Sequence, residues 1–249
     1  MRRQFTTLSA MGLLGFGVLS FSLLAQERTA TLLAQSSSAK LLPAIASFVD
    51  SLNDQQREQC LLPYTSEHRA QWHFVPMDTR KGLPLMQMQS EQKKVAMEVL
   101  QAVVSQIGYE KATGIMQLES LLKQLEGAGG RNERNPEKYY FTIFGDPGAE
   151  AHWGLSVEGH HLSLNFVIQG ERIVDSTPQF MATNPAVLQE TYSDRFPKGY
   201  AVLHDEEQLA FDLLHSLDEE QQKATMLAGE TPSEIRAAGK VQAPRPLEA

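Results

Sequence analysis

The stretch WGLSVEGHHLSLN, residues 153–165, decides the fold that the sequence predicts. Apolar and polar residues alternate on both sides of Glu158-Gly159, and such alternation is typical of strands with one buried face. A Glu-Gly pair also supplies the glycine that a two-residue hairpin turn favours. We therefore expect a β-hairpin whose strands are residues 153–157 and 160–168, with its turn at Glu158-Gly159.

The segments around this hairpin extend it into a sheet flanked by helices. Residues 140–144 alternate like a strand and end at a Gly-Asp-Pro-Gly turn, and residues 172–174 are expected to begin a fourth strand. Helical spacing of apolar residues predicts helices before and after this region. They are expected at residues 41–62 (with Asn53 capping a second segment), 87–126 (interrupted at Gly108), 204–217 and 218–227 (capped by Asp205 and Asp218). The sequence thus predicts an α+β fold, an antiparallel β-meander flanked by helices.

Composition and charge exclude several classes of protein. The 249 residues are 42% hydrophobic and 21% charged, which is ordinary for a globular protein. Lys and Arg number 22 against 30 Asp and Glu, so the formal net charge is -8. This sign argues against nucleic acid or an anionic membrane surface as the main partner. The single cysteine excludes an internal disulfide.

The first 25 residues are typical of a secretory leader. Arg2 and Arg3 precede an uncharged apolar stretch from Ala10 to Ala25, which is shorter than the ~20 residues that a membrane-spanning helix needs. Residues 2–5, Arg-Arg-Gln-Phe, are also similar to the core of a twin-arginine signal. We expect an exported protein, periplasmic or extracellular, that uses the twin-arginine or the general secretory machinery. After cleavage at Ala25 no stable membrane span is expected.

The remaining chain divides into three expected parts. Residues 26–40 are rich in Ala, Ser, Thr and Gln without a clear period and are expected to form a tether. Residues 41–228 are expected to form one α+β domain. Residues 229–249 are expected to be a C-terminal tail, or the start of a truncated part of the domain.

The two faces of the expected hairpin differ in polarity. With the turn at Glu158-Gly159, one face carries Trp153, Leu155, Val157, Leu162 and Leu164 and is apolar apart from His160. The other face gathers His152, Ser156, Glu158, His161, Ser163 and Asn165. On this register His152 and His161 lie diagonally, roughly 7–8 Å apart at the backbone.

Three hypotheses for this polar face remain open. In the first, His152 and His161 bind a divalent metal such as Zn, Fe or Cu together with a carboxylate from elsewhere, with His160 and Asn165 behind the ligands. In the second, a metal-free site uses His161 as general base toward a hydroxyl or water and Ser163 as nucleophile. Glu158 is the candidate ligand or base of the metal site. In the third, the polar face is structural, and His160 makes a hydrogen bond inside the core. A joint chelate by His160 and His161 would need a bulge or turn there.

Other motifs have simpler interpretations. The aromatic cluster of residues 69–76 is expected to pack in the core or to wall a pocket. Residues 80–82, Arg-Lys-Gly, are expected to form a solvated turn or to pair with an acidic helix start. Cys60 is expected to be a buried small hydrophobe. A zinc-protease helix, a phosphate-binding glycine loop and a Gly-x-Ser-x-Gly elbow are all absent, which disfavours those hydrolases.

The chain resembles the family called domain of unknown function 3500, over roughly residues 41–228. The resembling motifs are Arg69-x-x-Trp72-His73-Phe74-x-Pro76, Arg80-x-Gly82-Leu83, Ile115-Met116-x-Leu118-Glu119, Tyr140-x-x-x-Phe144-Gly145-Asp146-Pro147, the run of residues 153–165, Thr177-Pro178-x-Phe180 and Ser216-Leu217. The resemblance implies no activity. It implies that members continue past this chain's end into an aromatic, His-containing segment, so we expect the C-terminal part to be lacking.

Together these observations predict an exported protein with a His-based metal or ligand site on a β-hairpin. A metal-dependent hydrolase or oxidoreductase acting on a small-molecule substrate is one expectation. A non-catalytic periplasmic binding or structural protein is the alternative.

Overall fold

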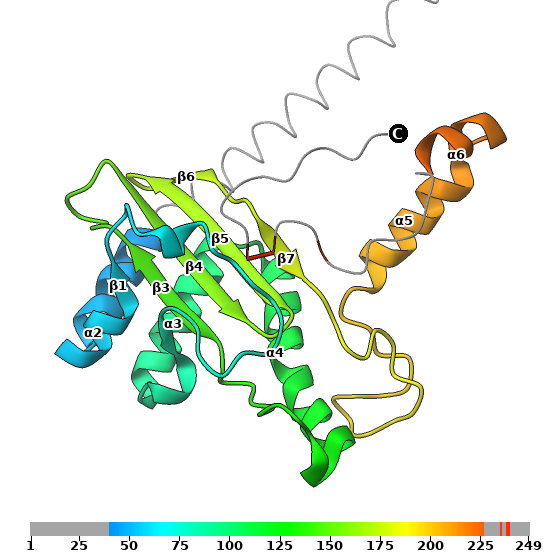
Figure 1. Cartoon of the computed structure of the whole chain (residues 1–249), viewed down its shortest axis with the longest axis horizontal. Helices are drawn as coiled ribbons and strands as arrows, with labels where there is room; N and C mark the ends of the chain where they lie inside the picture. Colours follow the sequence, from blue (N-terminus) through cyan, green and yellow to red (C-terminus); the bar gives the residue numbers. More distant parts are fainter. Residues whose placement is uncertain (1–39, 227–234, 236–237, 240–249) are drawn as a thin grey trace, which may run out of the picture.

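Strands β3 (Tyr140–Phe144), β4 (His152–Gly159) and β5 (Leu162–Gln169) form the centre of a seven-stranded sheet. The computed structural model describes residues 40–226, 235 and 238–239 (Figure 1). The strand predicted at residues 140–144 is confirmed, and the α+β class is confirmed. The leader, almost all of the expected tether and the expected tail lie outside the described residues.

Short strands complete the sheet at both edges. The strand β1 (Leu61–Leu62) pairs parallel with one half of β3, and β2 (Leu83–Pro84) pairs antiparallel with the other half. On the far side, β6 (Arg172–Asp175) and β7 (Gln179–Met181) pair antiparallel with opposite ends of β5. The fourth strand expected after residue 171 is therefore present, whereas β1, β2 and β7 are additional.

Helices lie before and after the sheet in the sequence. Residues 40–51 are helical, followed by α2 (Asp54–Cys60), α3 (Ser90–Val103), α4 (Gln106–Glu126), α5 (His204–Ser216) and α6 (Glu219–Thr225). Single-turn 3-10 helices span Glu67–Arg69, Leu85–Gln87 and Gly127–Gly129. The expected caps Asn53 and Asp218 are confirmed, because each side chain accepts a backbone N–H of its helix.

Two helix boundaries differ from those expected. The long helical region is interrupted at Val104, and Ser105 caps α4 by accepting the N–H of Gly108. Gly108 therefore lies inside the first turn of α4, where a serine cap outweighs the helix-weakening effect of glycine. Asp205 is not the cap of α5, which begins after Leu203 without a side-chain cap.

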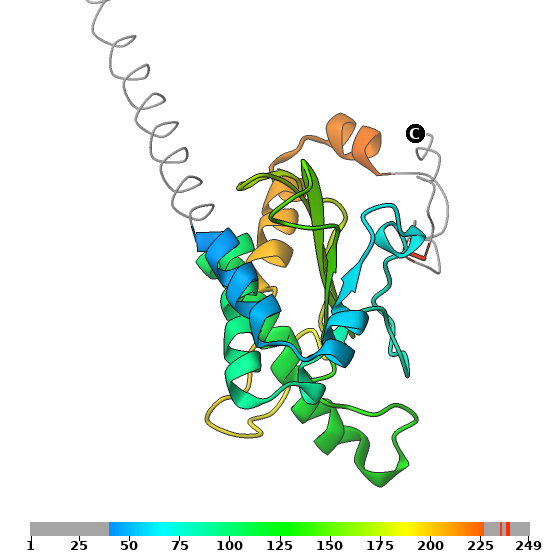
Figure 2. The ribbon, with the colours of Figure 1, turned by 90° about the vertical axis from the view of Figure 1, so that its left-hand side faces the viewer.

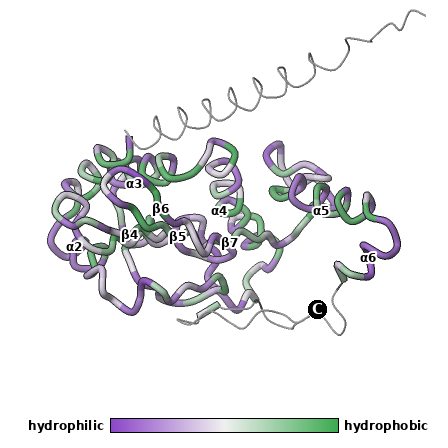
Figure 3. The backbone as a smooth tube through the Cα atoms, turned by 90° about the horizontal axis from the view of Figure 1, so that it is seen from above, coloured by the Kyte–Doolittle hydropathy of each residue, from purple (hydrophilic) through white to green (hydrophobic). Residues whose placement is uncertain are grey.

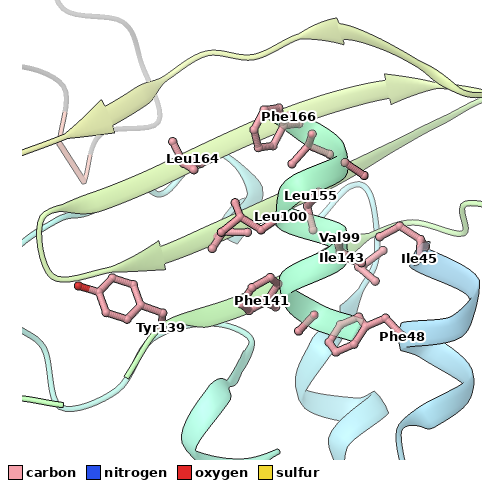
Figure 4. Packing of buried hydrophobic residues seen from close by; sticks show 14 of the residues in the cluster. Ile45, Phe48, Val99, Leu100, Tyr139, Phe141, Ile143, Leu155, Leu164 and Phe166 are labelled. Carbon is pink, nitrogen blue, oxygen red and sulfur yellow. The ribbon is translucent and has the colours of Figure 1, made fainter. Parts of the chain in front are cut away.

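The main core lies between the helices and one face of the sheet (Figures 2 and 4). Phe48 from the first helix and Val99 and Leu100 from α3 are fully buried against this face. The sheet contributes the apolar face predicted for the hairpin: Trp153, Leu155, Val157, Leu162 and Leu164 are all buried. The alternation of the hairpin sequence therefore identified this face correctly.

The opposite face of the sheet is covered by residues 63–82 (Figure 2). This segment contains one 3-10 turn and no other helix or strand. Beneath it Thr142, Ser156, Glu158 and Ser163 are at most 3% exposed. The polar face of the hairpin is thus a buried layer, and it is not the solvent side of the sheet.

The helices α5 and α6 stand apart from this body (Figures 1 and 3). Neither contains a buried residue, and Leu209, Phe211 and Leu213 of α5 are at least half exposed. None of the helices among the described residues has the length and apolar character needed to cross a membrane.

Candidate functional site

The turn of the hairpin consists of His160 and His161, which corrects the expected turn at Glu158-Gly159. Gly159 pairs with Leu162, and Glu158 pairs with Ser163, inside the strands. Gly159 serves close packing, because a Cβ there would lie 2.8 Å from Cγ of Tyr139 and closer to two other ring atoms. His161 takes the left-handed conformation of the turn, with φ of 60°, a region where histidine is among the better-tolerated non-glycine residues.

The new register separates the two histidines that were expected to share a metal. His152 pairs with Gln169 at the open end of the hairpin and is exposed, whereas His161 lies in the turn. Seven residue steps along β4 separate these ends by more than about 20 Å. The shared site of His152 and His161 is therefore not assembled. Within the described part of the chain, no group of three or more His, Cys, Asp and Glu side chains could hold a metal ion.

His160 instead contacts a buried carboxylate from α4. Its Nδ1 lies 2.5 Å from Oε1 of Glu119, and the two side chains are 10% and 6% exposed. A carboxylate only accepts, so we assign the Nδ1 proton to this hydrogen bond, which leaves Nε2 as the ring nitrogen able to accept a proton. The hydroxyl of Tyr139 donates to the carbonyl of His160 at 2.9 Å and holds the turn in place.

Arg134 adds a positive charge beside this pair. Its guanidinium donates to both carboxylate oxygens of Glu126, at 2.9 and 2.7 Å, and this pairing raises the pKa of Arg134. Nη1 of Arg134 lies 3.1 Å from Nδ1 of His160 and 3.9 Å from Oε1 of Glu119. Because a guanidinium only donates and Nδ1 carries a proton, Arg134 makes no hydrogen bond to Nδ1 and acts on the pair through its charge. Arg134 thereby attaches the loop after α4 to the helix and to the turn of the hairpin.

His161 is held neutral beside His160. Their ring centroids are 3.9 Å apart, and the backbone of His161 donates to Phe74 and accepts from Ala182. Burial, followed by the electrostatic effects of His160 and Arg134 on a protonated His161, lowers the pKa of His161 from 6.5 to about 4. The imidazole of His161 is therefore uncharged at neutral pH.

Acid should weaken the folded state through His161. The unfolded chain binds this proton near pH 6.5 and the folded chain near pH 4, so stability should fall as the pH drops through this window. His161→Asn, which tolerates the left-handed backbone, should remove about 1–2 kcal/mol of that decline. Urea unfolding at pH 7, 5.5 and 4 measures the decline of the unfolding free energy in each variant, with His152→Asn as control. Equal declines in the two variants would contradict this prediction.

A second buried cluster joins the hairpin to the covering segment. Nζ of Lys81 lies 2.8 Å from Oε1 of Glu158, and Arg80 lies 4.0 Å from its other oxygen. Ser163 donates to Glu158 at 3.1 Å and accepts from Asn165 at 3.1 Å. Residues 80–82 are therefore not a solvated turn, because the two cations reach down to a carboxylate on the sheet.

The predicted residues Glu158, Ser163 and Asn165 are thus brought together, but away from solvent. Ser163 is 0% exposed and Glu158 is 3% exposed, and Glu158 holds the covering segment through Arg80 and Lys81. Oδ1 of Asn165 and Oγ of its strand partner Ser156 are buried without a hydrogen-bond partner among the described residues. Catalysis by Glu158 and Ser163 stays a prediction.

Aromatic side chains seal this polar layer. Phe74 stacks on Phe180 of β7 with ring centroids 4.3 Å apart, and Trp72 lies 5.8 Å from the same ring. Phe180 is the strand partner of Ser163. The expected aromatic cluster of residues 69–76 therefore packs on the polar face of the sheet. Cys60 is fully buried as expected, and burial raises the pKa of its thiol to about 12.

A small cavity lies beside His160, and a larger groove shares four lining residues with that cavity. A cavity of about 20 Å³, enough for one water molecule, is lined by His160, Glu119, Tyr139 and Arg80 among others. A groove of about 600 Å³, the size of a small-ligand site, lies along the edge formed by β1 and β2. The residues that line both are Asp78, Arg80, Glu133 and Lys138.

Glu119 and Arg134 are the site residues that reasoning from the sequence missed. Glu119 occupies an apolar stripe of α4, four residues after Ile115 and three before Leu122, and is buried there. A charged residue in such a stripe is a detectable signal of a buried partner. Arg134 lies in a polar loop, where no pattern distinguishes it.

The comparisons with known proteins agree with the family resemblance. A family model described as "Protein of unknown function (DUF3500)" matches residues 34–248. No curated protein and no solved structure matches the chain. Since the matched region covers most of its 249 residues, the chain belongs to the DUF3500 family.

Proposed function

We propose that this chain is an exported hydrolase in which His160 activates a water molecule against a small substrate. The observation that supports this is the contact of 2.5 Å between His160 and Glu119 at the wall of a water-sized cavity. A buried carboxylate that fixes the imidazole tautomer is the arrangement of a general base. The adjoining groove has room for the substrate.

The proposed reaction needs one proton carrier. Nε2 of His160 takes a proton from water as its oxygen attacks the carbonyl or phosphoryl group of the substrate. Glu119 stabilises the resulting imidazolium, which then returns the proton to the leaving group as the scissile bond breaks. Arg80, which lines both hollows, is placed to stabilise negative charge that develops on the substrate.

A second candidate is a hydrolase or oxidoreductase that depends on a divalent metal such as Zn, Fe or Cu. It is favoured by the turn, which brings the rings of His160 and His161 within 3.9 Å, and by the low pKa of His161, since ligands must be deprotonated. The carboxylate on Nδ1 of His160 also resembles the support of a metal-bound histidine. The charge of Arg134 beside the turn weighs against a cation, so we favour the metal-free reaction.

The proposed location is outside the cytoplasm, by the twin-arginine or the general secretory route. The basic start and the short apolar stretch of the first 25 residues support it. Fractionation of cells that express the full chain tests this location, and recovery of the uncleaved chain in the cytoplasm would contradict it.

The reaction is tested with a panel of chromogenic esters, anilides and phosphate esters. We expect His160→Gln and Glu119→Gln to lower kcat/KM by about 10²–10⁴-fold, because the first removes the general base and the second removes the carboxylate that fixes its tautomer and stabilises its imidazolium. His152→Gln, at the far end of the hairpin, is the matched control and should leave the rate unchanged. Circular dichroism shows whether each variant is folded.

Each outcome of this assay supports the metal-free hydrolysis, refutes it or replaces it with a metal-dependent reaction. Equal rates in the original chain and the folded His160→Gln variant, including no hydrolysis by either, would refute the proposal. Loss of activity with a chelator and its return with Zn²⁺, Fe²⁺ or Cu²⁺ would replace the metal-free reaction with the metal-dependent one.

A further inference from the structure

The buried cluster beside the groove contains more positive than negative charge. Arg80, Lys81 and Glu158 have side chains that are 3%, 7% and 4% exposed. Among the described residues, Glu158 is the one carboxylate within 4.0 Å of either cation. Two cations and one anion leave a net charge of one positive unit in a place that water hardly reaches.

Such a charge is costly unless something else compensates it. Buried charges are normally paired, because removing an ion from water without a partner costs several kcal/mol. Burial lowers the pKa of both Arg80 and Lys81, against the opposing attraction of Glu158. The single carboxylate therefore does not fully offset the desolvation of the two cations.

The two cations also have hydrogen-bond donors to spare. Arg80 donates to the carbonyls of His73 and Val75, which uses two of the five N–H groups of a guanidinium. Lys81 donates to Glu158 and to the carbonyl of Gln71, which uses two of its three. Carbonyl partners add no charge, so these bonds position the cations without neutralising them.

Both cations line the groove, whose other walls are of mixed character. Apolar side chains come from Leu62, Pro84, Met86 and Tyr140. Of its other charged lining residues, Lys138 pairs with Glu133 at 3.2 Å and is thereby neutralised, and the carboxylate of Asp78 is exposed to solvent. A ligand in this groove therefore meets an apolar wall together with two buried cations that share one carboxylate.

We propose that the groove binds a carboxylate or phosphate group of its ligand against Arg80 and Lys81. The ligand class is a small anion with an apolar part, and the claim that this ligand is the substrate rests on the proposed hydrolase function. Arg80 also lines the water-sized cavity, so the bound anion would hold the adjacent bond of the ligand next to His160.

Calorimetric titration of the full chain with sodium phosphate and with sodium benzoate, at constant ionic strength, tests this proposal without any assay of activity. We expect at least one of the two anions to bind. Lys81→Met should raise the Kd of that anion about tenfold or more, because losing one hydrogen bond to a charged group changes affinity by about this factor. Lys123→Met, the same change on an exposed face of α4, should leave the Kd unchanged. Binding of phosphate alone or benzoate alone would identify the group.

A second variant covers the case in which Lys81→Met does not fold. Glu158→Gln raises the buried excess to two positive charges, so the anion should bind this variant more tightly and raise its Tm more than that of the original chain. Absence of binding by both anions, or a Kd that neither Lys81→Met nor Glu158→Gln changes, would overturn the proposal. Binding that responds to these variants without any hydrolysis would keep the anion site and refute only the hydrolase.

Discussion

Replacing Glu158 with alanine is expected to lower the free energy of unfolding by about 3–5 kcal/mol. The change removes the partner of two buried cations and also the acceptor of the Ser163 hydroxyl. Removing one member of a buried ion pair is costly because the remaining charge stays in a place of low dielectric constant. Urea unfolding measures the loss. Glu133→Ala, which removes an exposed partner of Lys138, should cost less than about 1 kcal/mol.

The same variant should release the segment that covers the sheet. Arg80 and Lys81 are buried in the folded chain, so trypsin should cleave after them slowly. In Glu158→Ala the cations lose their partner on the sheet, and cleavage at these two sites should precede cleavage elsewhere. A loss of stability below 1 kcal/mol, with unchanged cleavage, would mean that the aromatic contacts of Phe74 and Trp72 hold the segment without the ion pair.

The alternation of the hairpin predicted its strands and its apolar face but not its turn. In the observed register Val157 pairs with Leu164, whereas the expected turn at Glu158-Gly159 would pair it with His160. The pairing has moved by an even number of residues, so each side chain stays on the face that the alternation predicts. The face of Glu158, Ser163 and Asn165 was therefore predicted correctly. Alternation cannot fix the position of a turn, however, and the glycine was needed for packing against Tyr139.

The burial of the polar face was beyond what the sequence could predict. Its cover, residues 63–82, has no hydrophobic period and is attached by individual contacts, such as those of Arg80 and Lys81. The strands β1 and β2 are two residues long each, which is too short for alternation to be detected. These two strands form because each of them pairs with β3.

The candidate site was predicted in part. The sequence indicated the histidines of the hairpin as candidate site residues, and His160 and His161 lie at the proposed site. Their partners come from α4 and from the loop after it, 41 residues before His160 in the case of Glu119. A pattern within one segment does not indicate which distant side chain contacts it. The sequence therefore predicts His152 as the partner of His161, on a register that the structure corrects.

Replacing Gly159 with alanine should prevent the chain from folding stably, with a loss of more than about 4 kcal/mol. The added Cβ would overlap the ring of Tyr139. This side chain is 1% exposed and donates its hydroxyl to the carbonyl of His160, so it has no free space to turn into. To relieve this overlap, either Gly159 of β4 must lose its pairing with Leu162 of β5, or Tyr139 must leave the core. Thermal unfolding followed by circular dichroism measures the effect.

The matched control for this change is Gly129→Ala. A Cβ at Gly129 would meet nothing within 4 Å, so the free energy of unfolding should change by less than about 0.5 kcal/mol. If glycine at position 159 served only as a flexible turn residue, alanine would cost no more than about 1 kcal/mol there. A small loss of unfolding free energy in Gly159→Ala would therefore support a turn at Glu158-Gly159, with His160 and His161 inside the strand. Because adjacent residues of a strand face opposite ways, His160 could then no longer share one site with His161.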